Sequence, residues 1–273
     1  MMSSPFSLEN HTILVTGATG VGVGAGVSQA VLEAGGRLVI NGRREAQLAD
    51  ALERYPGAIG VLGDVTSEAD AERMFREASE RNGGPVTGLV NNAGVGLSEL
   101  FHEAGTEDFD RLYGVDVRGL WLMSRAFARQ ALGVVDSGAI VNISSVHSHS
   151  TMARYALYAG AKSAVEGLTR GMAVELGQHG IRCNSLGPGY VHAEQNADLI
   201  RSWTDDPEAW IADHRRNQQA IPRLIEAIDC GRAAVFLLSE ASRMMTGQSI
   251  YLDGGMTSMI YPRDILDDSP ETP

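Results

Sequence analysis

The sequence is poor in cysteine and has no long apolar run. Its two cysteines, Cys183 and Cys230, lie in unrelated contexts without a CxxC pattern, which argues against a disulfide scaffold and against a zinc or thiol redox site. No apolar stretch reaches the ~18 residues that a membrane span requires, and the first residues show no basic segment followed by an apolar one. We therefore expect reduced core thiols in a cytoplasmic protein that does not insert into a membrane.

Basic residues are also scarce relative to acidic ones. The chain has 22 lysines and arginines against 34 aspartates and glutamates, which gives a formal net charge of −12 at pH 7. A surface of that sign repels nucleic acid and anionic membranes unless a local basic patch intervenes. The histidines lack the spacing with carboxylates that a metal site would show, so no metal is expected. A small molecule is the expected binding partner.

Glycine, in contrast, is abundant, with 32 residues, and short apolar runs alternate with longer segments of helical period. Because strands this apolar are typical of a parallel sheet covered on both faces, we predict one α/β domain over residues 1–273. Its fold would be a Rossmann-type doubly wound parallel sheet of about seven strands with helices on both faces. The predicted strands are Thr12–Thr16, Arg37–Asn41, Ala58–Leu62, Gly88–Asn91, Ala139–Ser144, Arg182–Leu186 and Ser249–Leu252.

Two segments depart from the alternating pattern. Residues 190–224 form a polar stretch that contains Trp203, Trp210 and His214. This stretch is too long for an ordinary connection, so we predict a substrate lid there. Residues 261–273 carry several acids and prolines and are expected to be a mobile tail.

A glycine-rich turn follows the first predicted strand and accounts for part of the glycine excess. It contains Gly17, Gly20, Gly22 and Gly24, and a segment of helical period follows. Glycines let backbone N–H groups and a helix N-terminus approach a pyrophosphate that a β-carbon would hold away. The position of this turn after the first strand of an alternating chain predicts a dinucleotide site rather than an ordinary strand–helix corner.

The end of the second predicted strand indicates which dinucleotide is bound. The sequence there is Asn41-Gly42-Arg43-Arg44, where an acid would bind the ribose 2′-hydroxyl of NAD. A glycine followed by arginine removes that repulsion and offers guanidinium donors to a 2′-phosphate. NADP(H) is therefore the favoured coenzyme, with NAD(H) as the alternative. Asp64, which follows the third strand, is expected either to accept from the adenine amino group or to cap the next helix.

The predicted catalytic residues follow the fifth strand. Ser145 comes directly after the end of this strand, and Tyr158 and Lys162 follow along the chain at i, i+4 spacing on one helix face. A nearby ammonium favours the phenolate, which suits Tyr158 to general acid and base catalysis. Ser145, by donating to the same substrate oxygen, would polarise a carbonyl or stabilise an alkoxide.

From about Leu8 to Met259 the chain resembles the short-chain dehydrogenase/reductase family in its classical single-domain form. The resemblance implies hydride transfer between a nicotinamide and a hydroxyl or carbonyl carbon, with Tyr158 exchanging the proton and Lys162 also binding the nicotinamide ribose. It is carried by Thr16-Gly17 with Gly22-Val-Gly24, Asp64-Val65, Asn91-Asn-Ala-Gly94, Ile143-Ser-Ser145, Tyr158-x3-Lys162, Ile181-Arg-Cys-Asn184, Pro188-Gly189 and Asp253-Gly-Gly255. The cofactor residues so predicted are Gly17, Thr19, Gly22, Gly24, Arg43, Asp64, Val65, Asn92, Tyr158, Lys162, Pro188, Gly189 and Val191, with Val191 expected at the carboxamide.

Three departures from the family pattern bear on the site. Four residues separate Gly17 from Gly22 where the family usually has three, so one extra residue lies within 18–21. Many members have an asparagine where this chain has Asp116, which we include among the catalytic residues because its charge would act on Lys162. The threonine often found four residues after the glycine of Pro188-Gly189 is Ala193 here.

Two other functions compete with alcohol and ketone chemistry. Tyr155 stands seven residues before Lys162, which is the spacing of the related enoyl reductases. A catalytically silent NADP-binding protein is the second alternative, although such a protein would usually have lost the tyrosine or the lysine. His147, Tyr155 and Trp203 are the candidate substrate residues.

Two segments indicate that the chain associates with copies of itself. They are the expected helix that carries Tyr158 and Lys162, and the apolar segment Leu112–Leu132. Small residues on this helix, Gly167 and Gly171 among them, permit close backbone approach to another helix. In the resembled family these two helices pair with their copies, so a homodimer or homotetramer is expected. The alternative is that both helices bury their apolar surface on their own sheet.

Overall fold

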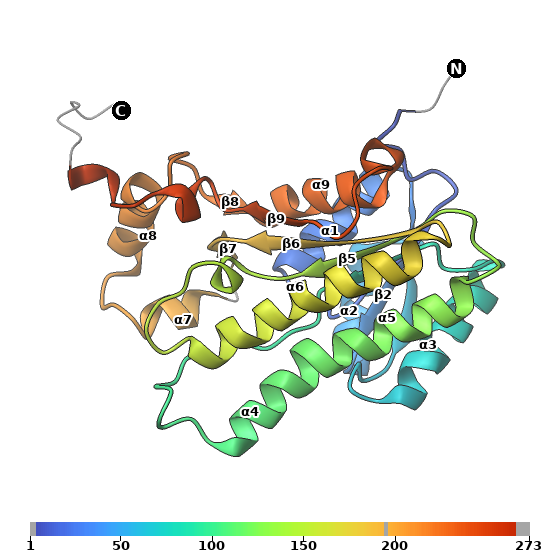
Figure 1. The fold of residues 1–273 in the computed structure, drawn as a ribbon, viewed down its shortest axis with the longest axis horizontal. Helices are drawn as coiled ribbons and strands as arrows, with labels where there is room; N and C mark the ends of the chain where they lie inside the picture. The colour runs from blue at the N-terminus through green and yellow to red at the C-terminus, as the bar shows by residue number, and fades with distance from the viewer. Residues whose placement is uncertain (1–3, 194–195, 266–273) are drawn as a thin grey trace.

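The computed structural model describes residues 4–193 and 196–265 and contains a seven-stranded, all-parallel sheet (Figure 1). The strand order is β3-β2-β1-β4-β5-β6-β9, so the chain moves outward from β1 in both directions and the predicted doubly wound fold is confirmed. The strands are β1 (Thr12–Val15), β2 (Arg37–Gly42), β3 (Ile59–Leu62), β4 (Gly88–Asn91), β5 (Gly138–Ile143), β6 (Ile181–Pro188) and β9 (Ser249–Leu252).

Helices cover both faces of the sheet because successive strand residues point to opposite sides. The helices on the first face are α1 (Val23–Glu33), α2 (Glu45–Arg54) and α9 (Ala227–Leu238), and those on the second are α3 (Glu68–Asn82), α5 (Leu120–Ala131) and α6 (Ala156–Gly177). In β1, Ile13 and Val15 pack into one apolar cluster with α1 and α9, whereas Leu14 packs into a second cluster with α3 and α5.

A π-helical segment interrupts the long helix that precedes β5. Helix α4 (Thr106–Tyr113) passes through Gly114–Gly119 with i→i+5 hydrogen bonding and continues as α5. Such wide turns are rare and frequently occur at functional sites. Asp116 lies within it, and its side chain is fully buried.

The predicted lid segment has more regular structure than its sequence indicates. It contains β7 (Val191–His192), α7 (Ala197–Arg201), α8 (Pro207–Asn217) and β8 (Ile225–Glu226), and β7 pairs in parallel with β8. Asp206 is the N-cap of helix α8, and its side chain accepts from Ala209 N at 3.0 Å. Strands of two residues are too short to give a sequence period, which is why the pattern did not predict them.

Short 3₁₀ turns complete the described chain at Val146–Ser148, Glu240–Ser242, Met256–Ser258 and Arg263–Ile265. Of the predicted tail, residues 266–273 lie outside the described residues. Within the described ranges, no helix combines the length and the apolar composition needed to cross a membrane.

Candidate active site

The predicted site residues come together at the carboxyl edge of the sheet. The glycine turn follows β1, Asn92 follows β4, Ser145 follows β5, and Gly189 follows β6. In open parallel sheets this edge, near the point where the strand order reverses, is where ligands bind.

Close packing between the turn after β1 and the segment after β4 explains the glycines there. Gly17 has a φ of +61°, and a β-carbon on it would lie 2.8 Å from the Cα of Ala93. A β-carbon on Gly24 would lie 2.5 Å from Nδ2 of Asn92. Asn92 Nδ2 in turn donates to the carbonyls of Thr16 and Gly17 at 2.9 and 3.2 Å, so it fixes the shape of the turn.

The start of α1 also suits the binding of a dinucleotide. Gly22 is the N-cap of α1 and has no side chain to occupy the N–H groups of the first turn. The first turn of α1 also carries no acidic residue that would repel a phosphate. The turn can therefore cradle a pyrophosphate.

The extra residue of the turn is accommodated by an arginine that sequence analysis did not single out. Arg54, the last residue of α2, donates from Nη1 to Gly20 O at 3.1 Å and from Nη2 to Thr19 O. Both carbonyls belong to the lengthened stretch. An exposed arginine at a helix end gives no sequence signal of such a role, because only the fold brings it to the turn.

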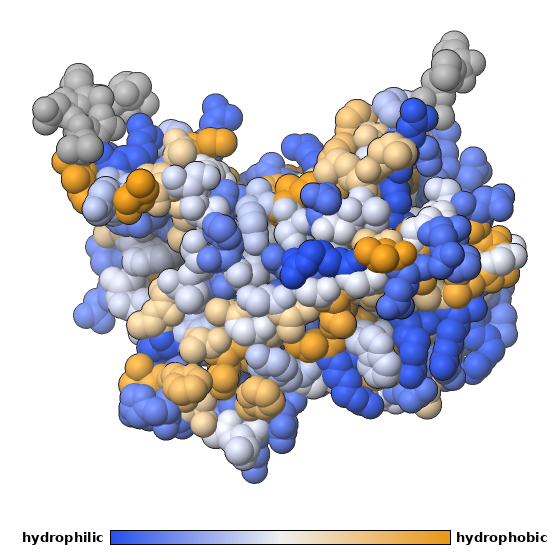
Figure 2. Space-filling model, viewed as in Figure 1, coloured by the Kyte–Doolittle hydropathy of each residue, from blue (hydrophilic) through white to orange (hydrophobic). Residues whose placement is uncertain are grey.

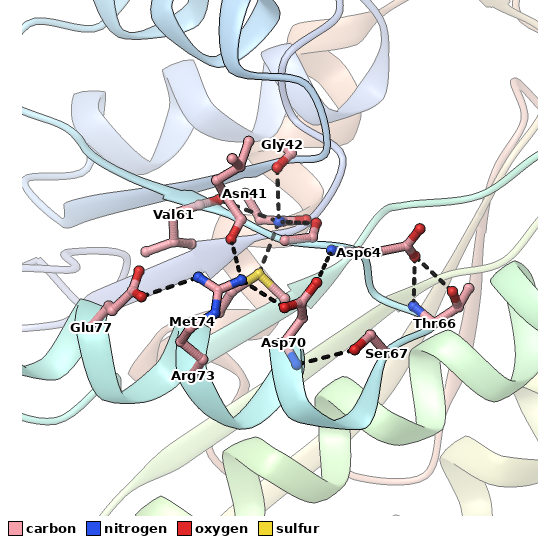
Figure 3. Close-up of polar contacts among 12 residues, drawn as sticks. Asn41, Gly42, Val61, Asp64, Thr66, Ser67, Asp70, Arg73, Met74 and Glu77 are labelled. Atoms are coloured by element: carbon pink, nitrogen blue, oxygen red, sulfur yellow. Dashed lines mark hydrogen bonds and ion pairs between the residues drawn. The ribbon is translucent and has the colours of Figure 1, made fainter.

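Polar contacts hold the ends of β2 and β3, where the adenosine half of a dinucleotide would lie (Figure 3). Asn41 Nδ2 donates to the carbonyls of Gly63 and Val61 at 3.0 and 3.4 Å. From α3, Asp70 Oδ2 accepts from Asp64 N at 2.9 Å, and Arg73 binds Asp70 at 2.7 Å. The backbone that presents Asp64 is therefore held from two elements.

Asp64 does not cap α3, although capping was one of its two expected roles. Its Oδ1 accepts from the backbone N and from Oγ1 of Thr66, at 2.9 and 2.8 Å, and Ser67 is the N-cap instead. The other carboxylate oxygen lies 3.9 Å from Nη1 of Arg43, which is 65% exposed. Val65 has a buried side chain that packs near Gly119, so only its backbone can face a ligand.

Lys162 is held between the sheet and the π-helical segment. Its Nζ donates to Ile143 O at 3.2 Å and lies 3.0 Å from Oδ2 of Asp116. Oδ1 of Asp116 accepts from Val95 N at 2.8 Å, so the carboxylate is itself fixed. Burial alone lowers the pKa of Lys162, but Tyr158 and Asp116 overcome this effect and raise the pKa above its ordinary value. Lys162 therefore remains a cation.

Tyr158 lies beside this cation and beside the turn that carries Ser145. Lys162 Nζ is 5.5 Å from the centre of the Tyr158 ring. The His147 ring meets the Tyr158 ring edge-on, with centroids 5.5 Å apart. Ser145 Oγ accepts from His147 N at 3.3 Å, which leaves the hydroxyl hydrogen of Ser145 free for another acceptor. The structure thus brings Asp116, Ser145, Tyr158 and Lys162 into one region, and their catalytic roles remain a prediction.

Tyr155 is buried behind His147 and is not exposed beside Tyr158 and Lys162. It is 7% exposed, and the His147 ring stacks on it with centroids 4.6 Å apart. Burial raises the pKa of Tyr155 and lowers that of His147, which favours the neutral form of both side chains. A buried phenol covered by an imidazole is poorly placed to meet a substrate.

The segment after β6 returns close to β9. Gly189 N donates to Leu252 O at 3.0 Å, and a β-carbon on Gly189 would lie 3.1 Å from the Cα of Asp253. The side chain of Val191 is buried in the apolar cluster that includes Ile225. Pro188 and Gly189 therefore lead from β6 into the lid segment, in which Val191 is the first residue of β7.

Aromatic side chains within the lid segment, residues 190–224, pack against one another. The Trp203 ring lies 5.5 Å from that of Trp210, which stacks on His214 at 5.1 Å, and Tyr190 meets His214 at 5.0 Å. Burial lowers the pKa of His214, so this cluster is uncharged. Trp203 forms the edge of the cluster and anchors the lid, and its predicted substrate contact remains a prediction.

The fold and this arrangement define a Rossmann-type dinucleotide-binding protein with a serine, tyrosine and lysine at the carboxyl edge of its sheet. A family model described as enoyl-(acyl carrier protein) reductase matches residues 17–257. Carbonyl reductase [NADPH] 2 from Sus scrofa is 36% identical over 242 residues, which cover 89% of this chain and 94% of the relative. L-xylulose reductase from Homo sapiens is 34% identical over 91% of this chain and 97% of the relative.

A solved structure agrees with these relatives. Gluconate 5-dehydrogenase from Burkholderia cenocepacia, in complex with NADP and tartrate, is 31% identical and superposes with a TM-score of 0.84 over 94% of this chain and 98% of that one. The chain belongs to the classical short-chain dehydrogenase/reductase family. It is an oxidoreductase that acts on CH–OH or C=O groups, and the relatives do not favour the enoyl reductase alternative despite the description of the family model.

Proposed function

We propose that the protein interconverts a secondary alcohol and a ketone with NADP(H), and that Tyr158 is its general acid and base. The observation that carries this proposal is the position of Lys162, whose ammonium is buried beside the Tyr158 ring and held by Asp116 and Ile143. When bound, the nicotinamide supplies or accepts the hydride at the carbinol carbon. Relatives named as carbonyl and xylulose reductases support a small ketone or ketose as substrate.

Each residue of the group has a separate part in this reaction. In the reductive direction Tyr158 gives its proton to the carbonyl oxygen, and in the oxidative direction it takes the proton from the hydroxyl. Ser145 donates a hydrogen bond to the same oxygen and stabilises the charge that develops there. Lys162 stabilises the phenolate, and Asp116 keeps the ammonium in place. His147, which is neutral and lies against Tyr158, is positioned to bind another hydroxyl of the substrate.

The preference for NADP(H) rests on Arg43 and Gly42. We expect Arg43→Ala to lower kcat/KM for NADP(H) by about 10- to 100-fold, since a charged hydrogen bond contributes about 1.5–3 kcal/mol. The value of kcat/KM for NAD(H) should stay within about threefold of the wild-type value. Arg44→Ala, which removes the neighbouring arginine, is the matched control.

The assay for this variant also tests the function. Consumption of NADPH and NADH is measured with a panel of ketones, ketoses and an enoyl thioester. Turnover of the ketones with NADPH supports the proposal. Turnover of the enoyl thioester alone, or tight NADP binding without any turnover, would replace it by one of the two alternatives. Equal losses for both coenzymes in Arg43→Ala would contradict the role of Arg43.

Assembly as a homodimer or homotetramer through α5 and α6 is part of the proposal. A β-carbon on Gly171 would meet no atom within 4 Å, so this glycine does not pack on its own sheet. On the same helix Val174 is 82% exposed, and Trp121 on α5 is also exposed. Figure 2 shows apolar side chains gathered over α4 and the neighbouring part of α6. Light scattering at micromolar concentration should give a multiple of 29.1 kDa, and the monomer mass alone would contradict this assembly.

A cytoplasmic location is the remaining part of the proposal. Both cysteines are buried and free, which suits a reducing compartment.

A further inference from the structure

A buried carboxylate lies one turn beyond Lys162 on α6 and has no part in the reaction described above. Tyr158, Lys162 and Glu166 follow one another at i, i+4 and i+8, so they share one face of the helix. Glu166 is only 8% exposed. Within residues 4–193 and 196–265 no basic side chain forms an ion pair with it. A buried carboxylate without such a partner needs hydrogen bonds to compensate its lost hydration.

Hydroxyl groups from three different parts of the chain supply those hydrogen bonds. Oε1 of Glu166 lies 3.2 Å from Ser144 Oγ, 2.5 Å from Ser148 Oγ and 3.0 Å from the Tyr251 hydroxyl. Ser144 directly follows β5, Ser148 ends the following 3₁₀ turn, and Tyr251 belongs to β9. The carboxylate therefore ties α6 to the turn after β5 and to the neighbouring strand.

This turn is the one that carries Ser145. Ser144 and Ser148 flank it, and Ser148 Oγ lies 2.6 Å from the carbonyl oxygen of Ser145 as well as 2.5 Å from Glu166. The backbone N of Ser148 also donates to that carbonyl at 3.0 Å. The single hydroxyl hydrogen of Ser148 is therefore shared between two acceptors, the Ser145 carbonyl and the Glu166 carboxylate, and a shift of the Ser145 backbone would disturb both contacts.

The opposite side of the turn is closed by backbone and by an aromatic ring. Ser144 N donates to Leu186 O at 2.7 Å. A β-carbon on Gly187 would lie 2.6 Å from Cδ1 of Tyr251 and 3.3 Å from the carbonyl carbon of Ser145. The Tyr251 hydroxyl, which donates to Glu166, also lies 3.3 Å from Ser148 Oγ, so Tyr251 contacts the turn itself.

We infer that Glu166 is a positioning residue for Ser145, holding its hydroxyl in the direction of the substrate oxygen through Ser144, Ser148 and Tyr251. The inference rests on the proposed function, because it assumes that Ser145 donates to that oxygen. It gives the site a second fixed carboxylate: Asp116, in the π-helical segment, holds the ammonium, and Glu166, on α6, holds the serine turn.

The test is a double-mutant cycle between Glu166 and Ser145. Glu166→Gln should lower kcat roughly tenfold or more for the ketone that the wild type reduces fastest, while the NADPH dissociation constant stays within about twofold. In a Ser145→Ala background the same change should lower kcat by less than about threefold, because the residue through which Glu166 acts is gone. Losses that multiply in the double variant would overturn the inference, as would an unchanged kcat in Glu166→Gln.

Further variants separate positioning from folding. Glu175→Gln removes an exposed carboxylate from the same helix and should leave kcat unchanged. Ser148→Ala removes only the shared hydroxyl and keeps the carboxylate, and it should reproduce the loss in kcat even if Glu166 variants fold poorly. Full activity of Ser148→Ala would contradict the inference. Failure of the proposed function itself is distinguishable, because the wild type would then reduce no ketone at all.

Discussion

Tyr158→Phe should lower turnover of alcohol and ketone by about 10³-fold or more, within the 10²–10⁴-fold range that general acid–base catalysis supplies. The change removes only the hydroxyl, and the ring remains between Lys162 and His147. The NADP(H) dissociation constant should therefore stay within about threefold of the wild-type value. Single-turnover rates and coenzyme fluorescence titrations measure the two quantities separately.

Tyr155→Phe is the matched control for this variant. It removes the same atom from a tyrosine one helical turn away, but that hydroxyl belongs to a buried ring under His147. We expect turnover within about threefold of the wild type, since the hydroxyl has no part in proton transfer. If Tyr158→Phe kept its rate within about tenfold, or if Tyr155→Phe were the inactive variant, the assignment of the acid would be wrong.

Asp116→Ala should destabilise the protein by about 3–5 kcal/mol, because it leaves the ammonium of Lys162 buried without its counterion. The pair is almost fully buried, with Nζ and Oδ2 3.0 Å apart, and the same carboxylate accepts from Val95 N. Asp116→Asn keeps an oxygen for Val95 and should cost markedly less. The expected order of the two stability losses follows from the contacts of Asp116. Asparagine is also the residue that many family members have at this position.

Denaturant unfolding measures the effect, with Asp110→Ala as the control. Asp110 is an exposed carboxylate on α4, and its removal should change the free energy of unfolding by less than about 0.5 kcal/mol. If Asp116→Ala were as stable as Asp110→Ala, the ion pair would not hold Lys162. Both variants remove the charge, so equal losses in alanine and asparagine would contradict the contribution that we expect from the oxygen that asparagine keeps for Val95 N.

The fold could be predicted from the sequence because its signals are local and repeated. Each apolar strand followed by a helical period predicts one step of the sheet, and the observed strands differ from the predicted ones by at most two residues at either end. The glycine turn was also predictable, since the tight approach of Asn92 and Ala93 excludes a β-carbon at Gly17 and Gly24. The alternation of strands and helices then places these residues at one edge.

Contacts between distant segments could not be predicted in the same way. That Asp116 touches Lys162 directly depends on the π-helical turn at Gly114–Gly119, which no sequence period indicates. The support that Arg54 gives to the lengthened glycine turn depends on where α2 ends. Glu166 had a sequence signal, its i+4 spacing from Lys162, but its hydroxyl partners come from the residue after β5, from a 3₁₀ turn and from β9.

The choice between Tyr155 and Tyr158 as the catalytic acid could not be made from the sequence either. Both tyrosines stand at spacings from Lys162 that occur in related enzymes, so spacing alone left two reactions open. The stacking of His147 on Tyr155 buries one phenol and leaves the other beside the ammonium. Side-chain packing distinguishes the two tyrosines, and this packing depends on contacts that local sequence patterns do not reveal.

The most direct test of the account is isotope transfer from NADPH labelled with deuterium at nicotinamide C4, prepared as each of the two stereoisomers. The protein is incubated with the ketone it reduces fastest, and the product is analysed by mass spectrometry and NMR. The account predicts that one stereoisomer delivers a single deuterium to the carbinol carbon and that Tyr158→Phe abolishes this transfer. Deuterium found instead on a saturated carbon of an enoyl substrate, or no transfer to any carbonyl compound, would contradict it.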